Sequence, residues 1–164
     1  MARLSYGHSL IAIAGRAWHR DPMPATKRVL FVGDSADERE MYAELFRRNG
    51  FCTLQASSAA DAFRLASDLA PEAVVTDVRL AGPEDGLGLT RRLKQDVHTQ
   101  QVPVVVLTGY VFTHDRTAAE RAGCDSFVAK PCLPDALWQI VGGLIARRDG
   151  SARASSFGDS PGSV

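Results

Sequence analysis

The sequence Ala73-Val74-Val75-Thr76-Asp77-Val78-Arg79-Leu80 carries the strongest indication of how the chain folds. An apolar run leads directly into one carboxylate, that of Asp77. Such a run is typical of a strand buried on both faces of a parallel sheet, and open α/β sheets bind their ligands beyond the C-terminal strand ends. A single aspartate at this position is more often a turn or helix-capping residue. Asp77 is therefore a candidate reactive group whose role depends on the rest of the chain.

The rest of the chain alternates between strand and helix patterns. Predicted strands lie at residues 28–32, 51–55, 73–77, 102–107 and 125–129. Helical patterns follow them: one between Ser35 and Asn49, one from Ser57 or Ser58 through Leu69, one around Leu89 and Leu93, one at residues 113–122 and one at residues 134–147. This alternation predicts a doubly wound α/β domain, and a flavodoxin-like parallel sheet of order 2-1-3-4-5 is expected.

The composition is that of a globular protein with balanced charge. The 164 residues include 19 basic and 19 acidic side chains, which gives no reason to expect nucleic acid or an anionic membrane as a partner. The mildly apolar residues 9–14 are far shorter than the roughly 18 residues of a membrane-spanning helix, so no anchor is expected. Three cysteines without a Cys-x-x-Cys pair are typical of reduced thiols. We therefore expect a cytoplasmic protein.

Both ends of the chain lack the hydrophobic periodicity of the middle. Residues 1–26 are predicted to be a disordered leader, and residues 149–164, rich in Ser, Gly and Ala, a disordered tail. This leaves one folded domain at residues 27–148. A further hypothesis is that Met23 is the native start, because regular structure is predicted only a few residues later; N-terminal sequencing of the native protein tests it.

Four reactive side chains are expected at one edge of this sheet. Asp34 follows the first predicted strand, Asp77 the third, Thr108 the fourth and Lys130 the fifth. In the order 2-1-3-4-5, Asp34 and Asp77 face each other across the ligand crevice. Phosphoryl transfer to a carboxylate needs such a set. Asp77 would be the nucleophile, Asp34 would help hold Mg²⁺, and Thr108 and Lys130 would stabilise charge on the transferred group.

Four motifs contain these residues. They are Val29-Leu30-Phe31-Val32-Gly33-Asp34, Asp77-Val78-Arg79-Leu80 with Asp85-Gly86 downstream, Val106-Leu107-Thr108-Gly109, and Lys130-Pro131. In this order they resemble the receiver domain of bacterial response regulators, of the single-domain, CheY-like kind, over residues 27–148. The resemblance implies that a sensor histidine kinase or a phosphotransfer protein phosphorylates Asp77.

The same resemblance implies further roles at the site. Asp34, Asp77 and the backbone carbonyl of Arg79 would hold Mg²⁺. Thr108 and Phe127 would be the hydroxyl and aromatic switch residues that reorient on phosphorylation, and the Lys130-Pro131 bond would be cis.

Two bulky side chains are expected to screen the acceptor from water. Arg79 and Tyr110 stand two residues after Asp77 and Thr108, the positions that have this role in the family. We therefore expect slow hydrolysis of the phosphoryl bond.

The sequence departs from the family pattern at the metal site. Gly33 stands where the family has the first of two adjacent acids, while Asp34 matches the more direct ligand, so weakened Mg²⁺ binding is expected. Losing a carboxylate also removes like-charge repulsion around Asp77. Glu38 or Asp37 could compensate through water, but the favoured interpretation of both is an ordinary first-turn helix charge.

The loop after Asp77 departs from the pattern as well. Ala81 replaces a usual proline, and Asp85-Gly86 is reached one residue late.

These observations predict a response regulator rather than an enzyme with a separate substrate. It would accept phosphate on Asp77, catalyse only its own phosphorylation and dephosphorylation, and signal through contacts with an unknown downstream protein. The alternative is a non-phosphorylated pseudo-receiver that acts as a protein-interaction module. A flavodoxin-like hydrolase or cofactor binder is poorly supported, since neither a Gly-rich phosphate loop nor a second catalytic acid beside Asp77 is evident.

Overall fold

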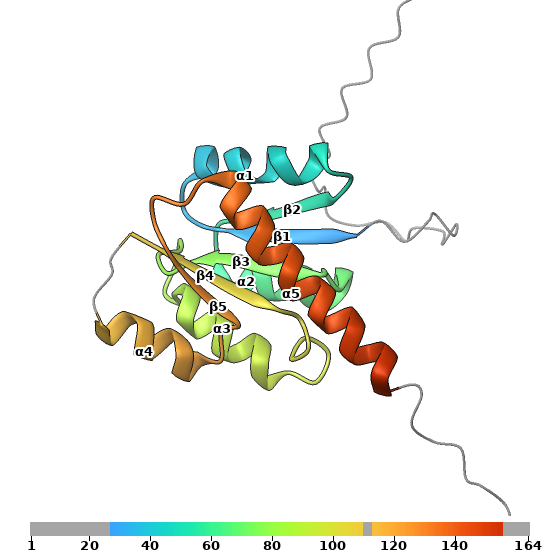
Figure 1. The fold of residues 1–164 in the computed structure, drawn as a ribbon. Helices are drawn as coiled ribbons and strands as arrows, with labels where there is room; N and C mark the ends of the chain where they lie inside the picture. Colours follow the sequence, from blue (N-terminus) through green and yellow to red (C-terminus); the bar gives the residue numbers. More distant parts are fainter. Residues whose placement is uncertain (1–26, 110–112, 156–164) are drawn as a thin grey trace, which may run out of the picture.

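Parallel strands alternate with helices along the whole described chain, which comprises residues 27–109 and 113–155 of a computed structural model (Figure 1). The strands are β1 (Arg28–Val32), β2 (Cys52–Ala56), β3 (Ala73–Asp77), β4 (Val104–Thr108) and β5 (Ser126–Ala129). The helices are α1 (Ala36–Arg48), α2 (Ala59–Leu69), α3 (Gly86–Gln95), α4 (Thr113–Ala122) and α5 (Pro134–Ser155). All strand pairs are parallel, in the order β2-β1-β3-β4-β5. The predicted doubly wound fold and strand order are confirmed.

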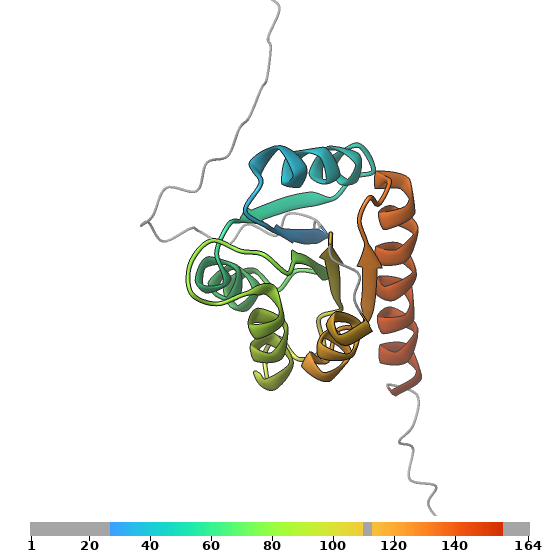
Figure 2. The ribbon, with the colours of Figure 1, turned by 90° about the vertical axis from the view of Figure 1, so that its left-hand side faces the viewer.

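Alternating strand side chains build two apolar cores, one on each face of the sheet. Val29 and Val75 belong to the core that α1 and α5 cover, whereas Leu30 and Val74 belong to the core beneath α2 and α3. Figure 2 shows α1 and α5 on one side of the sheet and the other helices on the opposite side. Burial of both faces explains why β3 and β4 each begin with an unbroken apolar run.

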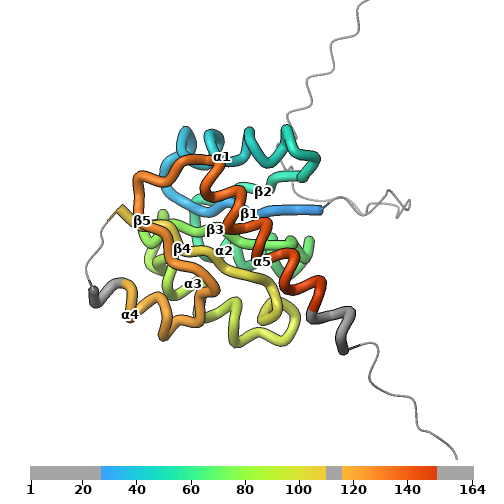
Figure 3. The backbone as a smooth tube through the Cα atoms, viewed as in Figure 1, coloured from blue at the N-terminus to red at the C-terminus, as the bar shows by residue number. Residues whose placement is uncertain are grey.

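The connections that follow the strands lie together at one edge of the sheet, on the left in Figure 3. Side-chain caps begin three of the helices at this edge. Ser35 accepts a hydrogen bond from the N–H of Glu38 at 3.3 Å, Ser58 caps α2 in the same way, and Asp85 accepts from the N–H of Gly88 at 2.7 Å. These caps satisfy backbone donors that the first helical turn leaves without partners.

Gly86, the first residue of α3, touches the backbone of Asp77. A β-carbon at position 86 would lie 1.8 Å from the carbonyl oxygen of Asp77, and the N–H of Gly86 donates to the carbonyl of Val78 at 2.9 Å. Because no side chain fits between the two backbones, glycine at this position lets α3 begin directly against the end of β3.

Helix α5 is longer than predicted. It continues through residues 149–155, so the prediction that these residues belong to a disordered tail is wrong. Arg148 contacts Glu72 at 2.5 Å and Asp149 contacts Lys27 at 3.7 Å, which anchors the helix where the apolar pattern ends. Adding residues to an existing helix is far easier than nucleating one, and Ala152, Arg153 and Ala154 favour helix.

Predictions about residues 1–26 and 156–164, including the start at Met23, lie outside the described residues. No helix in the described part of the chain has both the length and the apolar character that crossing a membrane requires.

Replacing Gly86 with alanine should destabilise the fold. The new β-carbon would collide with backbone rather than with a flexible side chain, so we expect Gly86→Ala to lower the free energy of unfolding by about 3 kcal/mol. The matched control is Gly142→Ala in α5, where a β-carbon meets nothing within 4 Å. Gly142→Ala should raise the free energy of unfolding by about 0.5–1 kcal/mol. Urea denaturation measures both, and similar changes for the two variants would contradict this account of Gly86.

Candidate functional site

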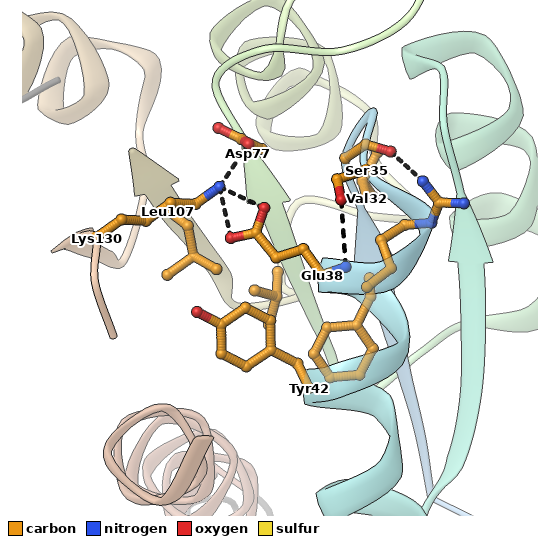
Figure 4. Close-up of a pocket in the computed structure, with 11 residues that line it drawn as sticks. Val32, Ser35, Glu38, Tyr42, Asp77, Leu107 and Lys130 are labelled. Atoms are coloured by element: carbon orange, nitrogen blue, oxygen red, sulfur yellow. Dashed lines mark hydrogen bonds and ion pairs between the residues drawn. The ribbon is translucent and has the colours of Figure 1, made fainter. Parts of the chain in front are cut away.

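A cleft opens at the edge of the sheet where the strands end. Its wall combines the ends of β1, β3 and β4 with the first turns of α1 and the residue that follows β5 (Figure 4). The residues that line it are Phe31, Val32, Gly33, Ser35, Glu38, Arg39, Tyr42, Val75, Asp77, Leu107 and Lys130. Two of the four predicted strand-end residues, Asp77 and Lys130, are therefore brought together here.

The ammonium group of Lys130 is the centre of the charged contacts in this cleft. Lys130 Nζ donates to Asp77 Oδ2 at 2.6 Å and lies 2.8 Å from both carboxylate oxygens of Glu38. Figure 4 shows Asp77 and Glu38 approaching this ammonium from β3 and α1. One cation thus joins three parts of the chain that are far apart in sequence.

The backbone around Lys130 fixes where its side chain begins. The N–H of Lys130 donates to the carbonyl of Thr108 at 2.7 Å, and the Lys130-Pro131 bond is cis, as the family resemblance implied. Burial of Lys130 opposes its charge and lowers its pKa, but the hydrogen bonds to Asp77 and Glu38 outweigh that effect. The pKa of Lys130 is therefore raised above its ordinary value, so its side chain is charged at neutral pH.

Asp77 keeps an accessible carboxylate despite the buried strand that carries it. Its side chain is 14% exposed. Oδ2 faces Lys130, and Oδ1 accepts a weak hydrogen bond from the N–H of Arg79 at 3.3 Å. The side chain of Arg79 is exposed.

Glu38 is a site residue that sequence reasoning named but did not favour. Its favoured interpretation was an ordinary first-turn charge, yet its side chain enters the cleft and pairs with Lys130. Tyr42, one turn further along α1, lines the same cleft and donates its hydroxyl hydrogen to the carbonyl of Cys132 at 3.0 Å. Burial raises the pKa of Tyr42, with the Cys132 thiol adding to the effect. The spacing of four residues between Glu38 and Tyr42 is the one signal that places both on the same helix face.

Gly33 and Asp34 differ in where they lie. Gly33 is buried and lines the cleft, whereas Asp34 is exposed and is not among the lining residues. A β-carbon on Gly33 would lie 3.6 Å from Asp77 Cβ, an ordinary contact. The guanidinium of Arg39 donates to the carbonyl of Gly33 and, at 3.3 Å, to the side chain of Gln55. The predicted role of Asp34 as a metal ligand stays a prediction.

Comparison with known proteins identifies the family. The family model of the response regulator receiver domain matches residues 29–142. The chain belongs to this receiver family.

Its relatives include regulators of different lengths. Response regulator Rre1 of Synechocystis sp. is 34% identical over 130 residues, which are 78% of this chain and 55% of Rre1. The polar-differentiation response regulator DivK of Brucella ovis is 29% identical over 107 residues, 65% of this chain and 85% of DivK. The chain thus spans little more than half of Rre1 but most of DivK.

Solved receiver structures share the fold. The receiver domain of a sensor histidine kinase from Pseudomonas aeruginosa PAO1, with a magnesium ion coordinated in its active-site cleft, is 25% identical, with a TM-score of 0.68 over 74% of this chain and 98% of that one. A two-component response regulator of the LuxR family from Aurantimonas sp. SI85-9A1 is 30% identical, with a TM-score of 0.66 over 75% of this chain and 87% of that one.

The two candidate switch residues of the receiver domain lie on the opposite face of the sheet from Asp77. Thr108 is buried and follows Val106 by two residues, and Val106 is paired with Phe127. Phe127 packs against the core beneath α2 and α3, as Val106 does. The residues are therefore near neighbours on one face. Tyr110, the second predicted screening residue, lies outside the described residues.

The donor atoms in the cleft are suited to a hard divalent cation. Among the described residues, no three acidic, histidine or cysteine side chains gather as a metal site. The carboxylates of Asp77 and Glu38 do share the cleft, and the backbone N–H of Arg79 contacts Asp77. Because Mg²⁺ often uses only one or two carboxylates and completes its octahedron with carbonyl, phosphate and water oxygens, these residues fit the ion.

Ala81 gives the loop after β3 a hydrogen bond that proline could not make. Its N–H donates to the carbonyl of Ser57 at 2.9 Å, and Ala81 forms an isolated bridge with Ser58. The longer loop of this receiver domain is thereby fastened to the connection between β2 and α2.

Substituting Ala81 with proline should remove the hydrogen bond between Ala81 and the Ser57 carbonyl. We expect Ala81→Pro to lower the free energy of unfolding by about 1 kcal/mol, because the Ser57 carbonyl loses its donor. Ala36→Pro is the matched control, since Ala36 is the first residue of α1 and follows an extended N-cap, where proline is well tolerated. Its change should stay within about 0.5 kcal/mol. Urea denaturation compares them, and an unchanged Ala81→Pro protein would show that the bond contributes nothing.

Proposed function

We propose that this receiver domain accepts a phosphoryl group on Asp77 from the phosphohistidine of a sensor histidine kinase or a phosphotransfer protein. The observation that supports this role is the contact at 2.6 Å between the ammonium of Lys130 and an Asp77 carboxylate that remains accessible from the cleft. A nucleophilic carboxylate with a fixed cation beside it is suited to stabilising the negative charge of a transferring phosphoryl group.

In the proposed step, an Asp77 carboxylate oxygen bonds to phosphorus while the bond from phosphorus to the donor imidazole breaks. The imidazole nitrogen keeps the electron pair and takes a proton, which restores neutral histidine. Lys130 holds the carboxylate in place before the transfer and then shares its hydrogen bonds with the phosphoryl oxygens. A bound Mg²⁺ would supply further neutralisation of the phosphoryl charge, with the Asp77 carboxylate and the Arg79 carbonyl, and Asp34 as predicted, as its protein ligands.

The phosphorylated domain would signal through a downstream protein rather than through nucleic acid. The added charge would draw Lys130 and Thr108 toward the phosphoryl group, and movement of Thr108 would make room for Phe127 on the same sheet face. The three cysteines are free thiols, which fits the proposed location in the cytoplasm.

The second candidate function is a pseudo-receiver that binds partners without being phosphorylated. One observation favours it: the cleft lacks an acid at Gly33, and Asp34 is exposed outside the lining. Under this alternative, the pairing of Lys130 with Asp77 and Glu38 would serve only to hold the fold.

Intact-mass measurement after incubation with Mg²⁺ and a small phosphodonor separates the two functions. We expect the wild-type protein to gain the mass of one phosphoryl group and Asp77→Asn to gain none. Asp68→Asn is the matched control, because Asp68 is exposed on α2. The Asp68→Asn protein should gain one phosphoryl group on Asp77, as the wild type does. If neither small donors nor a cognate kinase produces a wild-type adduct, the pseudo-receiver is the correct function.

The stability of the adduct tests the predicted role of Arg79. Its exposed side chain follows Asp77 by two residues, and we propose that it screens the phosphoryl group from water. Arg79→Ala should therefore lose radiolabelled phosphate faster than the wild type, whereas Arg91→Ala on the exposed surface of α3 should not. Rapid loss from the wild-type protein itself would refute slow hydrolysis.

A further inference from the structure

Gly33 leaves a space beside Asp77 that could hold a side chain. A β-carbon there would lie 3.6 Å from Asp77 Cβ and 3.9 Å from Arg39 Cγ, and glycine is not required by a left-handed backbone. A β-carbon therefore fits at this position, which lines the cleft. The difference from the family pattern is therefore chemical and not steric.

Glu38 brings a carboxylate to this cleft from another element. It lies on the first turn of α1, is 31% exposed, and places both oxygens 2.8 Å from Lys130 Nζ. The same ammonium is 2.6 Å from Asp77. The carboxylates of Glu38 and Asp77 thus face one cation from two sides, which shows that both can reach a common positive charge.

Neighbouring acids do not share this placement. Asp37 precedes Glu38 in the same helical turn but is exposed and does not line the cleft, and the same is true of Asp34. Lys130 is the cation that both carboxylates contact, whereas Arg39, the other basic residue of the cleft, donates to the Gly33 carbonyl and to Gln55.

We propose that Glu38 supplies a further carboxylate to the divalent-cation site, in place of the acid that the family has at the position of Gly33. This inference rests on the proposed function, because it concerns the ion that assists phosphorylation of Asp77. Mg²⁺ accepts carboxylate oxygens directly or through its retained water, so the longer glutamate side chain can act from α1. In this role Glu38 would exchange its contact with Lys130 for one with the ion, which would leave Lys130 available to the phosphoryl group.

Direct cation binding tests the proposal without any phosphoryl transfer. Mn²⁺ binding to the full chain is followed by the loss of the free-ion electron paramagnetic resonance signal, and Mg²⁺ is added as a competitor. Glu38→Gln should raise the dissociation constant about tenfold, a change of about 1.4 kcal/mol. Asp37→Asn is the matched control, because it removes an acid from the same turn but outside the cleft, and should change the constant less than about twofold.

A rescue variant makes the test specific to position 33. The double variant Gly33→Asp, Glu38→Gln should regain most of the lost affinity, since the new carboxylate occupies the open space beside Asp77. Equal weakening by Glu38→Gln and Asp37→Asn would overturn the proposal, because Glu38 would then act only as one more negative charge. A double variant as weak as Glu38→Gln alone, or wild-type protein without saturable Mn²⁺ binding, would also overturn it.

Failure of this inference is distinguishable from failure of the proposed function. A wild-type adduct at Asp77 together with unchanged Mn²⁺ affinity in Glu38→Gln overturns the role of Glu38 alone. Absence of any wild-type adduct overturns the phosphorylation of Asp77, whatever the cation measurements give.

Discussion

The ion-paired cluster around Lys130 is the interaction on which the site depends. Its ammonium ties the first turn of α1 to the end of β3 from the connection between β5 and α5. The three side chains are between 14% and 31% exposed, so solvent screens the pairs less than on the open surface. Removing one partner of a fully buried pair costs roughly 3–5 kcal/mol, and partial exposure reduces that cost here. The contacts thus orient Asp77, and the proposed function requires that they be weak enough to be exchanged for contacts with a phosphoryl group.

The fold supplies this cluster because strand direction and side-chain alternation are fixed together. Asp77 follows Val75 by two residues, so it points to the face that α1 and α5 cover. Thr108 follows Val106 by two and points to the other face. Asp77 and Lys130 consequently lie on one side of the sheet edge, and Thr108 and Phe127 on the other. The proposed signal from Asp77 to Phe127 would therefore cross the end of the sheet rather than pass along one face of it.

The sequence predicted the features that depend on hydrophobic periodicity. It did not predict those that depend on side-chain conformation or on contacts between residues far apart in the chain. The positions of Asp77 and Lys130 follow from apolar runs that end in polar residues at parallel strand ends, and the strand order follows from the flavodoxin-like fold that the alternation of strands and helices predicted. Glu38 was named but not favoured, because a first-turn acid is equally explained by the helix dipole and its extended side chain cannot be placed from spacing alone. The helical structure of the residues after Arg148 was not predicted because their composition is polar. The helix is held there by contacts with Glu72 and Lys27, which are distant in sequence.

One electrostatic argument explains why glycine at position 33 occurs together with an acid at position 38. With acids at both positions, three carboxylates would surround one lysine, and like-charge repulsion would raise the free energy of the cation-free cleft. With glycine at position 33, both remaining carboxylates pair with Lys130. Under the proposed role of Glu38, this arrangement would have a cost for cation binding, because a glutamate on α1 has more rotatable bonds to order than a short acid at a strand end. Such a receiver domain would favour a stable cation-free state over tight cation binding, and the ion would then be a condition for the proposed reaction and not a permanent part of the site.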